Sequence, residues 1–178
     1  MQLDLPDIFH GGDSALMREV RMPGMSYKEL QAQYGPSPTN VPFRNANFLS
    51  VAVTIAVTHQ ASEVWCGMHA EDAHNWAYPD CTPEFLGAFA AAVYVGTYHK
   101  VRLVFPIIWP MKADVVKVGL ELHAPYHLTW SCYEPKRLPA GLWVACGKCA
   151  TCIERRAAFL ANDTADPVEY VQDGEARP

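Results

Sequence analysis

The distribution of apolar residues along the chain predicts alternating helices and buried strands. Four stretches carry apolar side chains at helical spacing, where positions three and four apart share a face. Two short runs of apolar and β-branched residues between them are typical of strands buried in a parallel sheet. The predicted helices are residues 41–58, 83–96, 112–122 and 153–162, and the predicted strands are residues 63–68 and 101–108.

The first forty residues follow this alternation less clearly. Residues 3–9 are mildly apolar and could form a short strand. The sequence HGGDS at 10–14 is similar to the SGGxDS loop that binds pyrophosphate, but it lacks the leading serine and the residue between glycine and aspartate. It is therefore read as a turn into a short helix at 15–20. Residues 21–39 are predicted to be a loop, either a lid over a site or a plain surface excursion.

The alternation of strands and helices predicts an α/β layer structure. The two convincing strands are few for a complete doubly wound sheet, even if the regions around Leu3 and Tyr126 contribute. We divide the chain into an α/β core over residues 1–128, a cysteine-rich region with its helix over residues 129–162, and a flexible acidic tail over residues 163–178.

Composition and charge narrow the class of protein. The chain has 178 residues, of which half are hydrophobic and 19% are charged, so a folded core is expected. The net charge of −5 argues against direct nucleic-acid binding through a broad basic face. No apolar stretch is long enough to cross a membrane, and the first ten residues lack the basic start and apolar run of a signal peptide. A cytoplasmic location is expected.

Four cysteines near the end of the chain have the spacing of a structural zinc site. Zn²⁺ prefers four soft ligands at tetrahedral corners, and thiolates supply them. Two disulfides or four free thiols are the alternatives. Lys148, Arg155 and Arg156 are expected to offset the negative charge of a zinc tetrathiolate. The predicted ligands are Cys132, Cys146, Cys149 and Cys152.

Polar residues directly follow the first predicted strand. Ligands of open α/β sheets lie outside the carboxyl ends of the strands, so His69 and Asp72 are candidates for hydrogen bonding to a substrate or to the loop itself. Together with His74 they could also be read as metal ligands, although no ligand spacing supports that reading. Cys81, in the turn before the next helix, is either a nucleophile or a packed thiol, and packing is favoured because no base accompanies it in the sequence.

Two cations are predicted near the beginnings of helices. Arg44 and Asn45 fall in a first helical turn, where backbone amides favour an anion. Arg44 could therefore hold a phosphate or carboxylate, or pair with an acidic neighbour on the surface. Lys112 lies where the second strand leads into a helix and opposes the helix dipole. An acidic substrate would explain it, as would a partner such as Asp114 or Glu121.

Four ordered motifs together resemble the 7-cyano-7-deazaguanine synthase family. VPFRNANFLSVA resembles the family segment VPxRNxxFLSxA, and GMHAEDAHNWAYPDCTPEF resembles GxxxxDxxxYPDCxPEF. MKADVVKVGLEL is similar to the helix TKAEIVRLGLEL, and TWSCY with ACGKCATC to the zinc-binding end. The similarity covers most of residues 40–160. LDLPDIFHGGDSALM also resembles a family stretch, LDLSLLKELGGSAL, which separates the pair Gly11-Gly12 from any phosphate loop.

The resemblance implies a fold, a reaction and cofactors. The fold would be an adenine-nucleotide hydrolase-like parallel sheet of the PP-loop ATPase type, here incomplete, with a structural zinc. The reaction would use ATP and Mg²⁺ to convert 7-carboxy-7-deazaguanine and ammonia into the nitrile, through an acyl-adenylate and an amide. The four cysteines carry over as zinc ligands, and the other matched positions would line the site.

Roles follow for the matched positions. Arg44 and Lys112 would bind phosphate or carboxylate. Asp72 and Asp80 would form hydrogen bonds to substrate or hold Mg²⁺, with Asp80 in the catalytic group. The expected catalytic residues are Arg44, Lys112 and Asp80, and the expected substrate-binding residues are Asn45, His69, Asp72 and Tyr78.

The family's first strand and its SGGxDS loop have no counterpart in this sequence. A second chain could supply them, the chain could be a fragment, or it could be a degenerate relative that binds a deazapurine without converting it. A zinc-ribbon interaction module without a small ligand is a further alternative. The expected partners are a deazapurine substrate and a second chain with the pyrophosphate loop; a homo-oligomer is left open.

Overall fold

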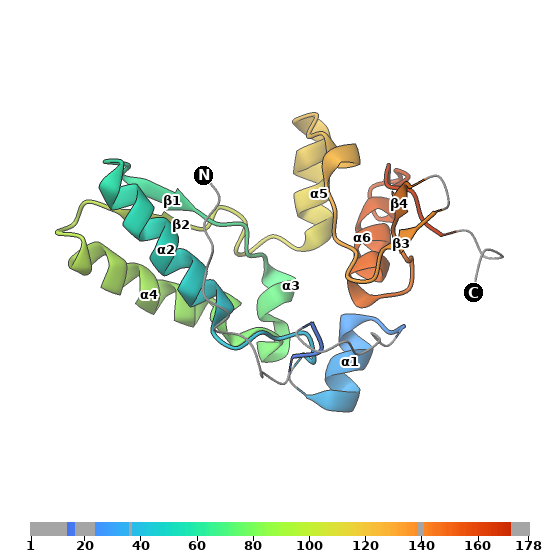
Figure 1. Ribbon diagram of the computed structural model, residues 1–178, viewed down its shortest axis with the longest axis horizontal. Helices are drawn as coiled ribbons and strands as arrows, with labels where there is room; N and C mark the ends of the chain where they lie inside the picture. The colour runs from blue at the N-terminus through green and yellow to red at the C-terminus, as the bar shows by residue number, and fades with distance from the viewer. Residues whose placement is uncertain (1–13, 17–23, 36, 139–140, 172–178) are drawn as a thin grey trace. The chain divides into compact units, whose positions relative to one another are not determined.

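The computed structural model describes residues 14–16, 24–35, 37–138 and 141–171 (Figure 1). It consists of two compact units. Residues 14–16 and 37–109 belong to the first, and residues 24–35 with those after 109 belong to the second. The boundary differs from the predicted one at residue 128, because the helix that follows the second strand packs on the cysteine-rich part of the chain. None of the described helices is long and apolar enough to cross a membrane.

The first unit is built on a small parallel sheet. Strand β1 (Glu63–Trp65) pairs with β2 (Arg102–Val104), and Val64 lies opposite Leu103. Helices α2 (Arg44–Thr58) and α4 (Pro83–Gly96) cover one face of this pair (Figure 1). The core between helices and sheet consists of the buried residues Ala56, Val93 and Val101, with the partly buried Val53, Val64, Phe89 and Leu103 packed against them. The predicted mixed α/β character is confirmed.

Both strands are shorter than the sequence predicts. One further bond extends the pairing, from the Cys66 N–H to the Val104 carbonyl at 3.0 Å. Pro106 then has no amide hydrogen to donate, which ends the ladder on the β2 side. The apolar run of β1 suggested a strand buried on both faces. Trp65 is 64% exposed, so within the described residues the strand is covered on one face only.

The two long helices of this unit match their predicted positions. Helix α4 begins at Pro83 behind Thr82, whose side-chain oxygen accepts a hydrogen bond from the Phe85 N–H at 3.3 Å. Helix α2 begins at Arg44, so Arg44 and Asn45 lie in its first turn as expected. Between the helices the chain forms α3 (Ala70–Ala73) and two 3₁₀ turns, η1 (His74–Trp76) and η2 (Pro79–Cys81). These short turns carry the polar candidates.

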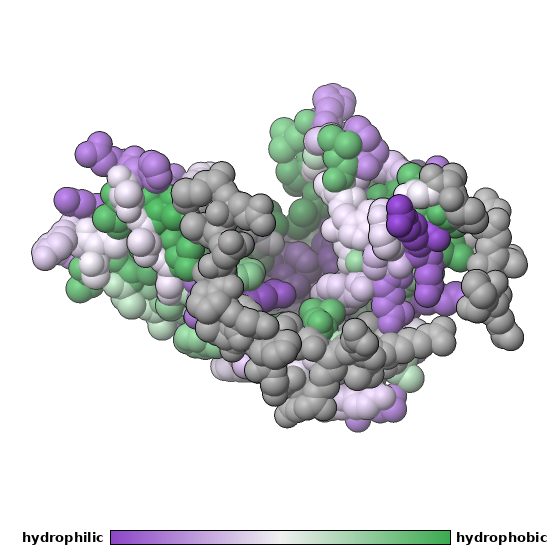
Figure 2. Space-filling model, in the orientation of Figure 1, coloured by the Kyte–Doolittle hydropathy of each residue, from purple (hydrophilic) through white to green (hydrophobic). Residues whose placement is uncertain are grey.

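The second unit packs α5 (Lys112–Glu121) against α6 (Ala150–Leu160). Val116, Ala158 and Phe159 are buried between them, and the Tyr126 ring stands edge-on to Phe159, 5.1 Å between centroids. Tyr126 belongs to a 3₁₀ turn, η3 (Tyr126–Leu128), rather than to the strand considered for this region. A short antiparallel hairpin, β3 (Lys136–Arg137) with β4 (Trp143–Val144), precedes α6. Apolar residues remain exposed on α5 (Figure 2).

Helix α1 (Tyr27–Tyr34) lies where the sequence analysis predicted a loop. The Ser26 N–H donates to the Glu29 carboxylate at 2.8 Å, and the Glu29 N–H donates to the Ser26 hydroxyl at 3.4 Å, which forms a capping box. Leu30 is buried at 1% exposure and anchors the helix. The loop prediction was wrong here because the capping signature was overlooked. The predicted strand at residues 3–9, the pair Gly11-Gly12 and most of the helix at 15–20 lie outside the described residues.

The tail was expected to be flexible, but its described part forms specific contacts with the rest of the second unit. The Tyr170 region forms a parallel bridge with Ala145, and the Val171 N–H donates to the Ala145 carbonyl at 2.9 Å. Asp166 forms an ion pair with Arg155 at 2.7 Å. The acidic composition suggested that this end of the chain is solvated, but the Asp166 carboxylate is paired with the buried Arg155.

Two glycines in helices should respond oppositely to alanine. A Cβ on Gly119 in α5 would overlap the Tyr126 hydroxyl and ring, whereas a Cβ on Gly87 in α4 meets nothing within 4 Å. We expect Gly119→Ala to lower the free energy of unfolding by about 1–3 kcal/mol through overpacking. Gly87→Ala should raise it by up to about 1 kcal/mol, since alanine is the better helix former. Thermal unfolding followed by circular dichroism measures both; equal melting temperatures would contradict the packing described for α5.

Candidate functional site

Four cysteines converge in the second unit. Cys146 follows β4, Cys149 is the N-cap residue of α6, and Cys152 lies in the first turn of that helix. Cys132 comes from the loop after η3 and is buried beside them at 8% exposure. One sulfur from each residue lies within 4.8 Å of all the others. The predicted ligand set is therefore brought together as a single group.

The sulfur positions suit a tetrahedral zinc ion. Sulfurs bound at about 2.3 Å from Zn²⁺ are about 3.8 Å apart at tetrahedral corners. The Cys152 sulfur is 3.9 Å from that of Cys146 and 3.5 Å from that of Cys149. A disulfide would need about 2.05 Å, and all four residues are free cysteines. The group can hold a metal ion, and zinc is the ion whose ligand preference it matches.

Backbone amides supply positive partial charge to the sulfurs. The Cys146 N–H donates to the Cys132 sulfur at 3.2 Å. The Cys149 N–H and the Lys148 N–H both donate to the Cys146 sulfur, at 3.3 Å and 3.4 Å. Gly147 makes this turn possible because its φ of 70° falls in the left-handed region. The same turn directs amides at a thiolate and points two thiols at one ion.

The pKa values of the cysteines are shifted in opposite directions. The side-chain hydrogen bond with Cys152 lowers the pKa of Cys149 to about 4. The pKa of Cys152 is raised, first by its hydrogen bond with Cys149 and then by burial. Burial raises the pKa of Cys132 to about 11. A dication that displaced these protons would stabilise all the sulfurs as thiolates.

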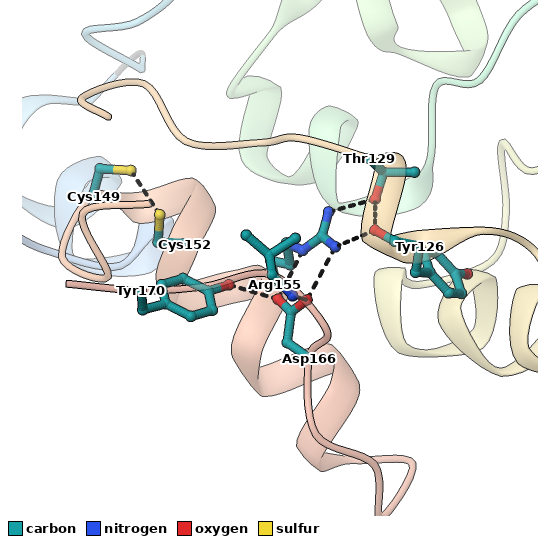
Figure 3. A network of polar contacts seen from close by, with 8 residues as sticks. Tyr126, Thr129, Cys149, Cys152, Arg155, Asp166 and Tyr170 are labelled. Atoms are coloured by element: carbon teal, nitrogen blue, oxygen red, sulfur yellow. Dashed lines mark hydrogen bonds and ion pairs between the residues drawn. The ribbon is translucent and has the colours of Figure 1, made fainter. Parts of the chain in front are cut away.

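Arg155 was expected to offset the negative charge of the thiolates, but its guanidinium is paired with Asp166 instead. Its guanidinium donates to Asp166 through Nε at 2.7 Å and through a terminal nitrogen at 3.0 Å (Figure 3). It also donates to the Thr129 hydroxyl at 2.8 Å and to the Tyr126 carbonyl at 3.2 Å. The Tyr170 hydroxyl donates to the same carboxylate. The charge of this buried arginine is offset by Asp166.

A second group of polar side chains lies in the first unit. The Asn45 backbone N–H donates to one Asp80 oxygen at 2.8 Å, and the Asn45 side-chain amide donates to the other at 3.2 Å. Asp80 is only 5% exposed and comes from η2, directly before α4. The anion favoured by the beginning of α2 is thus the protein's own carboxylate.

Arg44, Asp72 and Cys81 complete this group. The Asn45 side chain donates to the Cys81 sulfur at 3.1 Å, and the Arg44 guanidinium donates to the Asn45 oxygen at 3.4 Å. The pKa of Cys81 is raised to about 12, first by burial and then by the negative charges of Asp72 and Asp80. Arg44 and the Asn45 hydrogen bond oppose that rise. The thiol is buried and protonated, which agrees with the packed role favoured for it.

Asp72 connects the group to the remaining candidates. Its carboxylate accepts the His69 N–H at 3.2 Å and lies 3.6 Å from the His69 Nε2. The Asp72 carbonyl accepts the Tyr78 N–H at 3.1 Å. Within the part of the chain that the structure describes, the four cysteines are the group close enough to hold a metal, so the metal reading of His69, Asp72 and His74 gains no support.

Lys112 belongs to the second unit, unlike the other six candidates. It is the first residue of α5, and its amino group lies 5.9 Å from the centre of the Tyr27 ring. Its candidate partner Asp114 accepts the Met111 N–H at 3.0 Å and so caps the helix. The predicted junction of strand and helix is confirmed as the start of α5.

Sequence analysis missed two buried hydroxyls next to these candidates. The Tyr78 hydroxyl forms hydrogen bonds with Ser37 and Thr39, which are 4% and 2% exposed. Both belong to the segment read as a loop, and serine and threonine in a Pro-rich loop carry no signal of burial. Asp166 and Tyr170 were missed for a similar reason, because an acidic tail suggests solvent.

Zinc should bind once per chain, and its removal should unfold the second unit. We expect each Cys→Ser change in the ligand set to abolish the bound zinc, because three thiolates leave a buried site open. Metal analysis and the charge-transfer bands of the Co²⁺ form measure occupancy. Cys66→Ser in the first unit is the matched control and should keep full occupancy. A reduced wild-type chain that binds neither metal would contradict this site.

Cys81 should be slow to react with alkylating agents. Its pKa of about 12 leaves almost no thiolate at neutral pH, and the side chain is 4% exposed. Burial also raises the pKa of Cys66, but that residue is partly exposed and should be modified first. Mass spectrometry of the zinc-loaded chain after iodoacetamide treatment gives the order. Faster labelling of Cys81 than of Cys66 at neutral pH would show that the thiol is activated.

The comparisons with known proteins point to one family. The sequence model of the queuosine biosynthesis protein QueC matches residues 1–163. The chain is 39% identical over 159 residues to the 7-cyano-7-deazaguanine synthase of Pseudoalteromonas atlantica, which covers 89% of this chain and 67% of that protein. It is 43% identical over 138 residues to the enzyme of Methanoculleus marisnigri, covering 76% of this chain and 59% of that one.

A third relative gives the same picture. The 7-cyano-7-deazaguanine synthase of Chlorobaculum parvum is 42% identical over 165 residues, covering 87% of this chain and 67% of that protein. The matched region thus spans between 59% and 67% of the length of these three relatives. The four motifs, the small parallel sheet and the four-cysteine group all lie inside the matched residues. The chain belongs to the QueC family.

Proposed function

We propose that this chain takes part in the ATP-dependent conversion of 7-carboxy-7-deazaguanine and ammonia into 7-cyano-7-deazaguanine. The observation that supports this proposal is the gathering of polar side chains from separate motifs. Asn45 and Asp80 are 35 positions apart in sequence, yet the Asn45 side-chain amide donates a hydrogen bond to the Asp80 carboxylate. Arg44 and Asp72 are close enough to influence the same thiol. A cation, an amide and two carboxylates in one place suit a polar purine-like ligand.

The chemistry requires a leaving group. A carboxylate resists attack by ammonia because oxide is a poor leaving group. Transfer of AMP from ATP to a carboxylate oxygen releases pyrophosphate and creates an acyl-adenylate, which ammonia converts into the amide with loss of AMP and a proton. A second ATP transfers AMP to the amide oxygen with release of pyrophosphate and one amide proton, and loss of AMP and the second amide proton leaves the nitrile. Each tetrahedral or charged intermediate needs cations or hydrogen-bond donors close to it.

The residues have distinct roles in this proposal. Arg44 binds a phosphate or the substrate carboxylate. Its hydrogen bond to Asn45 is long, 3.4 Å, and made to a neutral group, so an anion would compete well for it. Asp72 accepts hydrogen bonds from the deazapurine or helps to hold Mg²⁺, which offsets phosphate charge when bound. Asp80 orients Asn45. Tyr78, Asn45 and His69 complete the substrate contacts of the first unit. Lys112 belongs to the second unit and is proposed separately as a residue that binds phosphate or carboxylate.

A second chain supplies the pyrophosphate-binding loop in this proposal. The matched region is 59% to 67% as long as the three relatives, and the SGGxDS motif that binds pyrophosphate does not occur within residues 1–178. Two other functions remain as outcomes of the test: a catalytically degenerate deazapurine-binding module, or an interaction module based on the zinc region alone. A homo-oligomer is compatible with each of them.

Calorimetric titration separates these functions. The zinc-loaded chain is titrated with 7-carboxy-7-deazaguanine and with ATP, alone and together with a polypeptide that carries the missing loop. Binding of the deazapurine, with nitrile formed only when the second polypeptide is present, supports the proposal. Binding without turnover in any combination identifies the degenerate module. No binding of deazapurine in any combination overturns the proposal and leaves the interaction module.

Arg44 offers a sharper test within the active assembly. We expect Arg44→Ala to lower kcat/KM for nitrile formation by about a hundredfold, since one charge-stabilising donor is worth about that much in other active sites. Arg102→Ala is the matched control, because Arg102 is an exposed arginine of the same unit that packs over Tyr94. Zinc content and melting temperature are recorded for both. Equal activity of the two variants would remove Arg44 from the site.

A further inference from the structure

Residues 164–171 form a segment that contacts Ala145, the Gly147 turn and the side chains of Arg155 and Arg156, here named the C-terminal strap. It follows α6 and lies beyond the residues that the family model matches. Composition alone predicted a loose acidic tail. Its contacts are instead concentrated on the two parts of the chain that carry the metal ligands. This distribution suggests a task at the metal centre.

The first part that the strap holds is the turn containing Cys146. The Ala145 N–H donates to the Glu169 carbonyl at 2.9 Å, and the Val171 N–H donates to the Ala145 carbonyl at 2.9 Å. Ala145 precedes the ligand directly and is 3% exposed. Both of its backbone groups are therefore engaged by the strap, and Cys146 cannot swing outward unless these bonds break.

The Tyr170 side chain covers the same turn. Its ring lies 3.5 Å from the position that a Cβ on Gly147 would occupy. The guanidinium of Arg156 lies over the other part of the ring, 5.2 Å from its centroid. The pKa of the Tyr170 hydroxyl is raised, by burial first and by its bond to Asp166 next, so it remains a donor at neutral pH.

The strap also reaches the segment that leads to Cys132. Asp166 accepts hydrogen bonds from the Tyr170 hydroxyl and from two nitrogens of Arg155, which is 8% exposed (Figure 3). Arg155 in turn donates to the Thr129 hydroxyl, three residues before the first ligand. One carboxylate thus connects the strap, the helix that carries Cys149 and Cys152, and the approach to Cys132.

We propose that the C-terminal strap clamps the metal centre and slows the loss of zinc. A ligand leaves the ion only when its segment opens locally, and the strap adds hydrogen bonds and ring contacts that must break first. The proposal requires zinc at the four cysteines but does not depend on the reaction proposed above. Its failure would therefore leave the deazaguanine chemistry untouched, and a failure of that chemistry would leave the strap untouched.

The experiment measures zinc release from the full chain. Protein loaded with one zinc ion is mixed with excess 4-(2-pyridylazo)resorcinol, and the absorbance of the zinc complex is followed. We expect release at least about tenfold faster from Tyr170→Ala, which loses ring and hydroxyl, and about twofold to threefold faster from Tyr170→Phe, which loses the hydroxyl alone. Hydrogen exchange of the amides at residues 145–149 should accelerate in the same order.

Two control variants separate a clamp from general stability. Glu169→Ala changes an exposed strap side chain but keeps its backbone bond, so it should release zinc at the wild-type rate. Lys117→Gly destabilises α5 in the same unit at an exposed position, because glycine is a poor helix former. If Lys117→Gly speeds zinc release as much as Tyr170→Ala for an equal loss of melting temperature, the clamp is overturned.

The remaining outcomes also decide the question. Release at the wild-type rate from both Tyr170 variants overturns the proposal. If Tyr170→Ala does not retain its fold, Tyr170→Phe decides alone: faster release than from Glu169→Ala supports the clamp, and equal release rejects it. Circular dichroism and zinc content measured before mixing establish which case applies.

Discussion

The second unit depends on the close approach of four sulfur atoms. Its buried apolar cluster is small, with Val116, Ala158 and Phe159 at its centre. The chain between η3 and α6 has a single two-residue-per-strand hairpin as its regular structure among the described residues. So little core leaves the irregular segments without enough apolar burial to fix them. A metal ion shared by the four cysteines would replace that burial, because its binding free energy would become folding free energy.

The charged groups around the four cysteines are each offset by a neighbouring group. Amide groups of the Cys146–Cys149 turn face the sulfurs, while the buried Arg155 is paired with Asp166. Burial raises the pKa of Asp166, but the hydrogen bonds from Arg155, Tyr170 and the Val168 amide outweigh it, and the net shift is downward. A depressed pKa means that this carboxylate stabilises the fold above its ordinary value of about 3.9 and that the contribution is lost as the pH falls through the folded value.

The sequence was informative where local chemistry decides the structure. Thr82 followed by Pro83 placed the start of α4, and the cysteine spacing brought together the complete metal-ligand group. It was less informative where partners distant in sequence decide. The extent of β1 and β2 depends on which residues pair across the sheet, and the order of residues 164–171 depends on their contacts with Ala145 and the buried Arg155. Helix α1 is a different case, since its capping box was present in the sequence and was not used.

The role of Asp80 also depends on a partner that is distant in the sequence. The sequence and the family resemblance placed this carboxylate among the catalytic residues, and nothing in the residue type separates that role from a structural one. In the fold both of its oxygens accept hydrogen bonds from Asn45, and the side chain is almost fully buried at the beginning of α2. Such a carboxylate is held in one orientation and fixes Asn45, which in turn contacts Arg44 and Cys81. This geometry favours Asp80 as the residue that positions the other members of the group. Arg44, whose polar contact with Asn45 is the longest of the set, is the better candidate for direct contact with a ligand.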